Sequence, residues 1–211
     1  MRKQVLIEMV ESRLSGGDTT ADVKSRYHGA IIEKHIEAAY NKLIRDTYEE
    51  GVKNQDFSQL DMYARTFRNI DVSDDTDRNL KYSLLPFPPV RLPENLGIRM
   101  LYPQNDPTNP FAHVDSNSQA VFTVLDVGRV DDVPSFWIEK YEGNVYRIYY
   151  DQPDLSTLKI AVLMLLPLSQ YDDFDEIPMP AGQDLAVVDL IVERMSAMAP
   201  EDQINDNIAK Q

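Results

Sequence analysis

The spacing of hydrophobic residues predicts three helices in the first part of the chain. Apolar residues recur every three or four positions over Arg2–Leu14, Ile32–Thr47 and Phe57–Ile70, as they do when one face of a helix is buried. A glycine pair follows the first of these segments and Gly51 follows the second, so we expect both helices to end there. Together these segments predict a helical region over residues 1–78.

The middle of the chain changes to a pattern that is typical of strands. Apolar and aromatic residues gather in short segments that prolines interrupt, which favours edge strands and loops over helices. The sequence Glu142-Gly-Asn144 lies between two aromatic-rich segments and indicates a hairpin. The predicted extended segments are Tyr82–Leu85, Pro86–Leu92, Ile98–Tyr102, Ala120–Val127, Phe136–Tyr141, Val145–Tyr150 and Leu158–Leu166.

The end of the chain returns to a helix and then loses its hydrophobic pattern. An acidic loop leads to the segment Asp184–Met198, whose apolar residues recur on one side of a helix. Residues 199–211 are polar and predict an extended tail. We expect this tail to contact a partner through four residues, namely Ile204, Asn205, Asn207 and Ile208.

The order of these elements predicts an α+β fold. The N-terminal helices and the late helix would form a small bundle, with a β-rich insertion, sandwich or barrel-like, between them. The predicted regions are residues 1–78 for the helices, 79–170 for the insertion, 171–198 for the acidic loop and the late helix packing on the N-terminal helices, and 199–211 for the extended C-terminal tail.

Composition narrows the class of protein. The chain has 211 residues, of which 43% are hydrophobic and 27% are charged, as in globular proteins. It has no cysteine, so it forms no disulfide and has no thiol nucleophile. The longest apolar run, Ile160–Leu166, is far shorter than the roughly 20 residues that cross a bilayer. Because Glu8 and Glu11 interrupt the start of the chain, we expect a soluble protein that is not exported.

The charge argues against tight binding of nucleic acid. The formal net charge is −14, from 21 basic and 35 acidic residues, and most of the acidic excess lies after residue 80. Sequence-specific binding of nucleic acid requires a basic surface, whereas an acidic surface repels polyanions. Two interpretations remain open at this point: a solvated acidic surface, or a surface along which DNA slides.

Two acidic segments have oxygen ligands but lack the spacing of a metal site. The segment Asp71–Asp77 alternates oxygen-bearing side chains as a calcium loop does, but Thr76 and Tyr82 occupy the positions where an EF-hand has glycine and glutamate. The carboxylates of residues 172–176 have no spacing that imposes a geometry on an ion. We therefore interpret the first segment as a solvated turn.

The remaining residue types predict no catalytic site. His28 and His35 are two helical turns apart, roughly 10 Å, which is too far to share a zinc ion, and His113 is remote in sequence. Neither the Gly-x-Ser-x-Gly elbow of hydrolases nor a glycine-rich phosphate loop occurs. We expect a protein that is not an enzyme and that has no cofactor and no metal, with carboxylate-pair hydrolysis as a remote alternative.

The aromatic residues of the predicted hairpin allow two interpretations. Trp137, Tyr141 and Tyr146 could form a platform for a sugar ring, as in a glycan-binding β-sandwich. Alternation along the strand favours cross-strand packing instead, because neighbouring residues point to opposite faces of a sheet.

Three parts of the chain together resemble a known family. These are Ile32–Thr47, the hairpin Phe136–Tyr150 with Leu158–Leu166, and Ile177-Pro-Met-Pro180 followed by Asp184–Met195. Their order resembles the head-to-tail connector proteins of tailed bacteriophages, the adaptor or ring proteins that lie below the portal. Within that family the sequence is most similar to ring proteins of crAss-like phages of gut bacteria.

The resemblance implies a structural function in the virion. It implies a homo-oligomeric ring, commonly twelve-fold, that contacts the portal protein on one side and another ring or tail protein on the other. Genome DNA would pass through the channel without specific binding during ejection. The protein would be made in the host cytoplasm and would act at the head-to-tail region of the virion. Another virion or tail structural protein remains the alternative.

Overall fold

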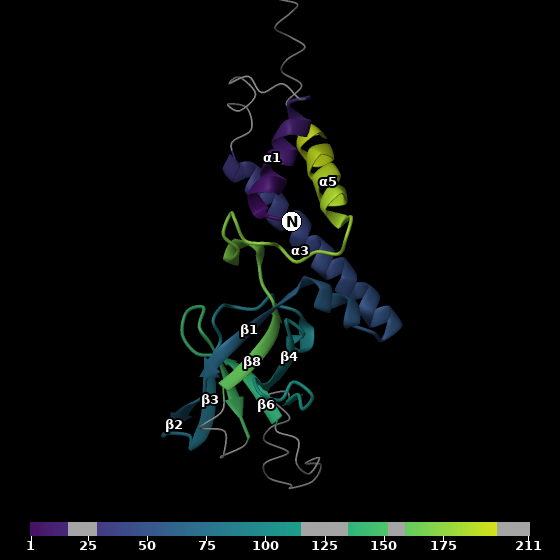
Figure 1. The fold of residues 1–211 in the computed structure, drawn as a ribbon. Coiled ribbons are helices and arrows are strands. Elements are labelled where there is room, and N and C mark those ends of the chain that lie inside the picture. The colour runs from purple at the N-terminus through teal and green to yellow at the C-terminus, as the bar shows by residue number, and fades with distance from the viewer. Residues whose placement is uncertain (17–28, 115–134, 152–158, 198–211) are drawn as a thin grey trace, which may run out of the picture. The chain divides into compact units, whose positions relative to one another are not determined.

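The computed structural model describes residues 1–16, 29–114, 135–151 and 159–197. The chain folds into two compact units (Figure 1). The helical unit comprises Met1–Glu50 and Tyr171–Gln211, so it is built from both ends of the chain. The β unit comprises Gly51–Gln170 and contains sheets of three and five strands. The predicted α+β fold class is therefore confirmed.

Among the described residues, three α-helices contribute to the helical unit. They are α1 (Lys3–Leu14), α3 (Gly29–Asn54) and α5 (Gln183–Ala197). Helix α5 lies beside α1 (Figure 1), and an ion pair between Arg13 and Asp189 joins the two. The interior residues recur at helical spacing, which confirms the predicted amphipathic faces. They are Leu6 and Val10 of α1, Ile32, Ile36, Ala39, Tyr40 and Ile44 of α3, and Val187, Val188, Ile191 and Met195 of α5.

The end of α3 differs from the prediction. Gly51 was expected to terminate the helix, but the helix continues to Asn54, and Gln55 takes the left-handed conformation that ends it, at φ 54°. A Cβ atom on Gly51 would lie 2.7 Å from a ring carbon of Phe57 and 2.9 Å from the carbonyl oxygen of Asp56. Glycine is therefore required at this position because the chain folds back against the helix.

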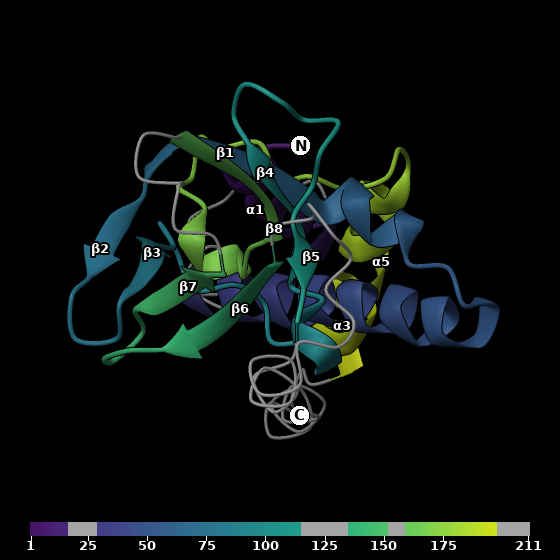
Figure 2. The same ribbon diagram turned by 90° about the horizontal axis from the view of Figure 1, so that it is seen from below.

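The β unit contains two sheets (Figure 2). The three-stranded sheet is antiparallel and has β8 (Lys159–Leu165) between β1 (Ala64–Asp71) and β4 (Ile98–Pro103). The five-stranded sheet has, in spatial order, β2 (Ser73–Asp75), β3 (Leu80–Leu84), β7 (Tyr146–Tyr150), β6 (Ser135–Lys140) and β5 (Ala112–His113).

One face of the five-stranded sheet belongs to the core. The ring of Tyr150 meets the ring of Phe111 edge-on, with 5.7 Å between their centroids, and Phe111 is hydrogen-bonded to Leu101 of β4. The buried Ser83 hydroxyl donates a hydrogen bond of 2.8 Å to the carbonyl oxygen of Asp71 in β1. Apolar packing and a side-chain hydrogen bond thus connect the two sheets.

The predicted helix over Phe57–Ile70 is wrong. A short 3₁₀ helix covers Ser58–Tyr63, and β1 begins at Ala64. Half-buried residues recur every third position in β1, and one extra residue interrupts its register with β8 between Phe67 and Ile70. A bulged edge strand therefore has an apolar spacing that is similar to that of a helix.

The other strand predictions have mixed outcomes. The hairpin at Glu142-Gly-Asn144 is confirmed, since Tyr141 and Val145 are hydrogen-bonded across the turn that joins β6 and β7. The segment Pro86–Leu92 forms no strand, and residues 73–75, predicted as part of a solvated turn, form β2. The predicted strand Ala120–Val127 lies outside the described residues.

Candidate functional site

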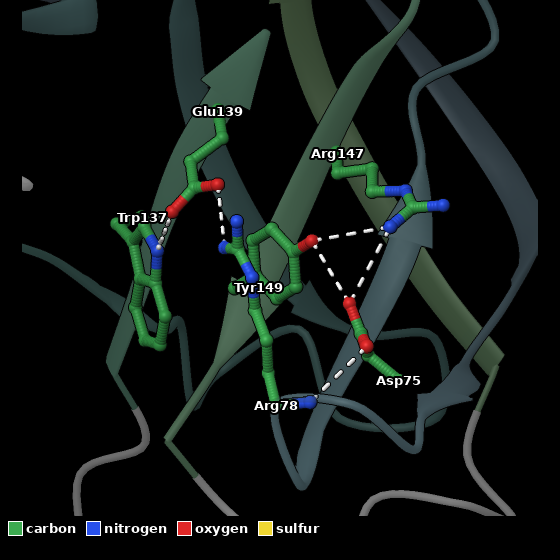
Figure 3. A network of polar contacts seen from close by, with 6 residues as sticks. All are labelled: Asp75, Arg78, Trp137, Glu139, Arg147 and Tyr149. Atoms are coloured by element: carbon green, nitrogen blue, oxygen red, sulfur yellow. Dashed lines mark hydrogen bonds and ion pairs between the residues drawn. The ribbon is translucent and has the colours of Figure 1, made fainter. Parts of the chain in front are cut away.

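The second face of the five-stranded sheet carries a group of charged and aromatic side chains (Figure 3). The register places Tyr82, Tyr149 and Trp137 in one row across β3, β7 and β6. It places Leu84, Arg147 and Glu139 in the next row. We call the group the polar–aromatic cluster and define it as Asp75, Arg78, Tyr82, Trp137, Glu139, Tyr141, Arg147 and Tyr149.

Trp137 and Tyr149 form the centre of the polar–aromatic cluster. Their rings are stacked, with centroids 5.6 Å apart and planes inclined by 16°. The indole Nε1 of Trp137 donates a hydrogen bond of 3.1 Å to Glu139, which also accepts one of 2.7 Å from Arg78. The guanidinium of Arg78 lies 5.0 Å from the centroid of the Tyr149 ring, close enough for a cation–π interaction.

Arg147 organises the other side of the cluster. Its Nη1 donates to the hydroxyl of Tyr149 at 3.2 Å, and that hydroxyl donates to Asp75 Oδ2 at 3.1 Å (Figure 3). The guanidinium also lies 3.4 Å from the ring centroid of Tyr141 and 4.4 Å from that of Tyr82. One arginine is thus held by two rings, a hydroxyl and a carboxylate.

The charges within the polar–aromatic cluster stabilise one another. The hydrogen bond to Glu139 raises the pKa of Arg78, with the charge of Glu139 as the second cause. The hydrogen bond to Tyr149 raises the pKa of Arg147 against the opposing effect of burial. The two guanidinium groups face two carboxylates, Asp75 and Glu139, so the four charges balance.

This arrangement favours a stiff sheet face over a sugar platform. Trp137 is only 2% exposed, and one side of its ring is occupied by Tyr149. Tyr146 pairs with Lys140 and therefore points to the opposite face from Trp137 and Tyr141. The structure does not bring the three proposed sugar-binding residues together, and the predicted cross-strand packing is confirmed.

Sequence reasoning missed three charged residues of the polar–aromatic cluster, namely Asp75, Arg78 and Arg147. The usable signal was the hairpin, because its turn fixes which residues of β6 and β7 are opposite each other. Alternation then places Arg147 and Tyr149 on the face of Trp137. Asp75 and Arg78 carried no such signal, since they come from a hairpin far away in the sequence.

The other candidate residues are dispersed or outside the described part of the chain. His35 lies on α3 and His113 on β5, whereas His28 and the predicted partner-binding residues Ile204, Asn205, Asn207 and Ile208 are not described. Among the described residues, no three histidine or carboxylate side chains come close enough to hold a metal ion.

Neither a scan against models of protein families nor a search of curated proteins finds a match. Within the described ranges, the helices lack the combination of length and apolar composition that crossing a membrane requires.

Proposed function

We propose that this chain is a non-enzymatic structural protein of a phage virion, a head-to-tail connector subunit that forms a ring below the portal. The ring forms part of the DNA conduit and a platform for tail assembly. Its partners are copies of itself, the portal protein and an adjacent ring or tail protein. The subunit is made in the host cytoplasm and acts at the head-to-tail region of the virion.

The observation that carries the proposal is the construction of the helical unit from both ends of the chain. Residues 1–50 and 171–211 form one unit, and the β unit, residues 51–170, lies between these two segments in the sequence. The same order, helices followed by a β-rich insertion and a late helix, is what the resemblance to connector proteins implies.

The acidic charge supports a conduit through which DNA moves. The net charge of −14 repels phosphate groups, and few attractive contacts form when a duplex slides past such a surface. Attractive contacts to several phosphates would hold the DNA in place, because each one releases counterions and adds to affinity.

The polar–aromatic cluster supports a scaffold rather than a reaction centre. Its two arginines and two carboxylates bind one another, and its tryptophan is buried. Side chains held in this way keep a sheet rigid. A rigid sheet face preserves the shape of a subunit that must match its neighbours around a ring.

The proposal is tested by the mass of the assembled protein. We expect the purified full-length chain to form rings at high concentration, or when it is mixed with purified portal rings. Native mass spectrometry measures the number of subunits, and negative-stain electron microscopy shows the ring. A chain that remains a monomer both alone and with portal rings would contradict the proposal. Catalytic turnover on peptidoglycan or polysaccharide would favour the hydrolase alternative instead.

A further inference from the structure

Three exposed hydrophobic side chains lie at one corner of the five-stranded sheet. Leu84, Tyr141 and Val145 are 50%, 50% and 42% exposed. Tyr141 and Val145 are opposite each other at the hairpin end of β6 and β7, where the amide of Tyr141 donates to the carbonyl oxygen of Val145 at 3.0 Å. Leu84 of β3 pairs with Arg147 of β7. Because alternate residues of a strand point to one face, all three share the face of Arg147. We call Leu84, Tyr141 and Val145 the apolar corner.

The guanidinium of Arg147 lies among the side chains of the apolar corner. Its central carbon is 3.4 Å from the ring centroid of Tyr141, and 16% of the Arg147 side chain is exposed. Both of its hydrogen bonds within the polar–aromatic cluster leave from Nη1. Its Nε has no hydrogen-bond partner among the described residues. A guanidinium has five N–H donors, so this one has donors left for a further carboxylate.

This surface fits an extended segment of a particular composition. Arg147 has an apolar neighbour on each side, Val145 two residues away along β7 and Leu84 across on β3. In an extended chain, residues two apart point to the same side and are separated by roughly 6.5–7 Å, the same spacing as that of Val145 and Arg147. The complementary ligand is therefore a segment that has a carboxylate between two apolar residues at alternate positions.

The C-terminal tail contains a segment of this composition. Ile204, Asp206 and Ile208 are at alternate positions in a tail that is otherwise almost entirely polar, and it lies outside the described residues. In an extended chain these three side chains point to one side, while Asn205 and Asn207 point to the other. Residues 198–208 span up to roughly 35–40 Å when extended, so the segment reaches well beyond the end of α5.

We propose that the apolar corner binds the C-terminal tail in an extended conformation. The carboxylate of Asp206 meets the guanidinium of Arg147, and the side chains of Ile204 and Ile208 cover the exposed Leu84, Tyr141 and Val145. Burial of apolar surface and a charge-assisted hydrogen bond both favour the contact. The inference goes beyond the proposed function, because the tail binds the sheet whether or not the subunits form a ring.

Disulfide trapping in the full-length chain tests the contact. The chain has no cysteine, so an introduced pair provides its only thiols. We expect Val145→Cys, combined with either Ile204→Cys or Ile208→Cys, to form a disulfide under mild oxidation. The control combines Val52→Cys with the same tail cysteine, since Val52 is an exposed valine of α3 outside the apolar corner. A non-reducing gel shows the bridged protein, as a compact monomer if the tail belongs to the same copy and as a dimer if it belongs to another.

A charge reversal in the tail tests the contact with Arg147. In the bridging chain, Asp206→Arg places a second cation against the guanidinium and should slow disulfide formation roughly tenfold or more. Asp202→Arg is the matched control, because it makes the same change in the same tail outside the binding segment. Asp206→Asn keeps the size of the side chain and removes its charge, so its rate should lie between the two.

Three results would overturn the inference. If the Val145 and Val52 pairs form disulfides at equal rates, the tail has no preference for the apolar corner. If neither Val145 pair forms one, the tail does not bind there. If Asp206→Arg and Asp202→Arg have equal effects, no carboxylate of the binding segment meets Arg147. The proposed function is decided separately, by the mass of the wild-type chain alone and with portal rings.

Discussion

Gly97 lies so close to the backbone of Val90 that a residue with a side chain does not fit at this position. A Cβ atom at this position would overlap the carbonyl oxygen of Val90, and it would also meet Val90 C at 3.1 Å. Both segments are fixed to β8, because Leu165 donates to Gly97 and accepts from Val90. The backbone there cannot move aside without breaking hydrogen bonds of the sheet.

We therefore expect Gly97→Ala to lower the free energy of unfolding by about 1–3 kcal/mol, the usual cost of overpacking. Gly29→Ala is the matched control, since no described residue lies within 4 Å of the added methyl group there. Urea denaturation of the two variants measures the difference. Equal midpoints for both would show that the segment around Val90 is free to shift.

We expect Tyr150 to make the free energy of unfolding depend on pH in the alkaline range. Burial raises the pKa of its phenol, and the neighbouring Ser83 hydroxyl offsets part of that rise. Below about pH 10 the phenol is protonated in the folded and unfolded states alike, so it adds no pH dependence. Above that pH the unfolded state ionises first, so the free energy of unfolding falls as pH rises.

The prediction concerns the slope of stability against pH. Wild-type protein should lose stability above about pH 10 more steeply than Tyr150→Phe, which keeps the ring and removes the ionisable group. Denaturant unfolding at several pH values measures the slope. Parallel curves for the two proteins would mean that the Tyr150 phenol ionises at its ordinary pKa while the protein is folded.

At the scale of elements, the hydroxyl of Tyr149 in β7 connects that strand to Asp75 of the β2–β3 hairpin. Tyr149 is 1% exposed, and its hydroxyl is bonded to two charged groups, Arg147 and Asp75. Tyr149→Phe should lower the free energy of unfolding by about 1.5–3 kcal/mol, as expected for hydrogen bonds to charged groups.

The same chemical change on an exposed ring provides the control. Tyr141 also contacts Arg147 through its ring, but the residue is 50% exposed. Tyr141→Phe should change stability by no more than about 0.5 kcal/mol, since the ring contact is retained. Thermal or urea unfolding followed by fluorescence measures both variants. A similar loss of unfolding free energy in the two variants would show that the hydrogen bonds of the buried Tyr149 hydroxyl do not stabilise the fold.

Hydrophobic spacing predicted the regular elements and failed where backbone geometry interrupts it. The helices α1 and α5 and the hairpin of β6 and β7 follow from spacing and turn residues alone. The bulge in β1 produced a helix-like spacing over Ala64–Ile70, so that strand was predicted as helix. A single sequence does not contain the register of β8, which is what makes the segment a strand.

The candidate sites show the same limit. Periodicity placed Trp137 and Tyr141 on one strand face, but it could not bring Arg78 and Asp75 to them. The ring of Phe67, on a strand, contacts the ring of Phe87, in a loop, and no local pattern pairs the two residues. Contacts between segments distant in sequence depend on the tertiary fold, which local spacing does not encode.

At the scale of the whole molecule, the two units differ in whether one continuous segment of the chain forms them. The β unit is continuous, whereas the helical unit requires residues on both sides of it. Helix α5 contributes four buried side chains, Val187, Val188, Ile191 and Met195. Each such side chain stabilises the folded state by about 1.5–3 kcal/mol, and together they are comparable to the entire stability of a domain, about 5–15 kcal/mol.

Removing residues 171–211 should therefore unfold the helical unit and leave the β unit folded. Trp137 is the only tryptophan and is 2% exposed in the β unit, so its fluorescence reports that unit alone. We expect the truncated chain to keep the emission of a buried indole, while circular dichroism shows a loss of helix larger than the deleted residues explain. Residues 51–170 expressed alone should give the same emission. An exposed indole in both chains would mean that the β unit needs the helical unit to fold.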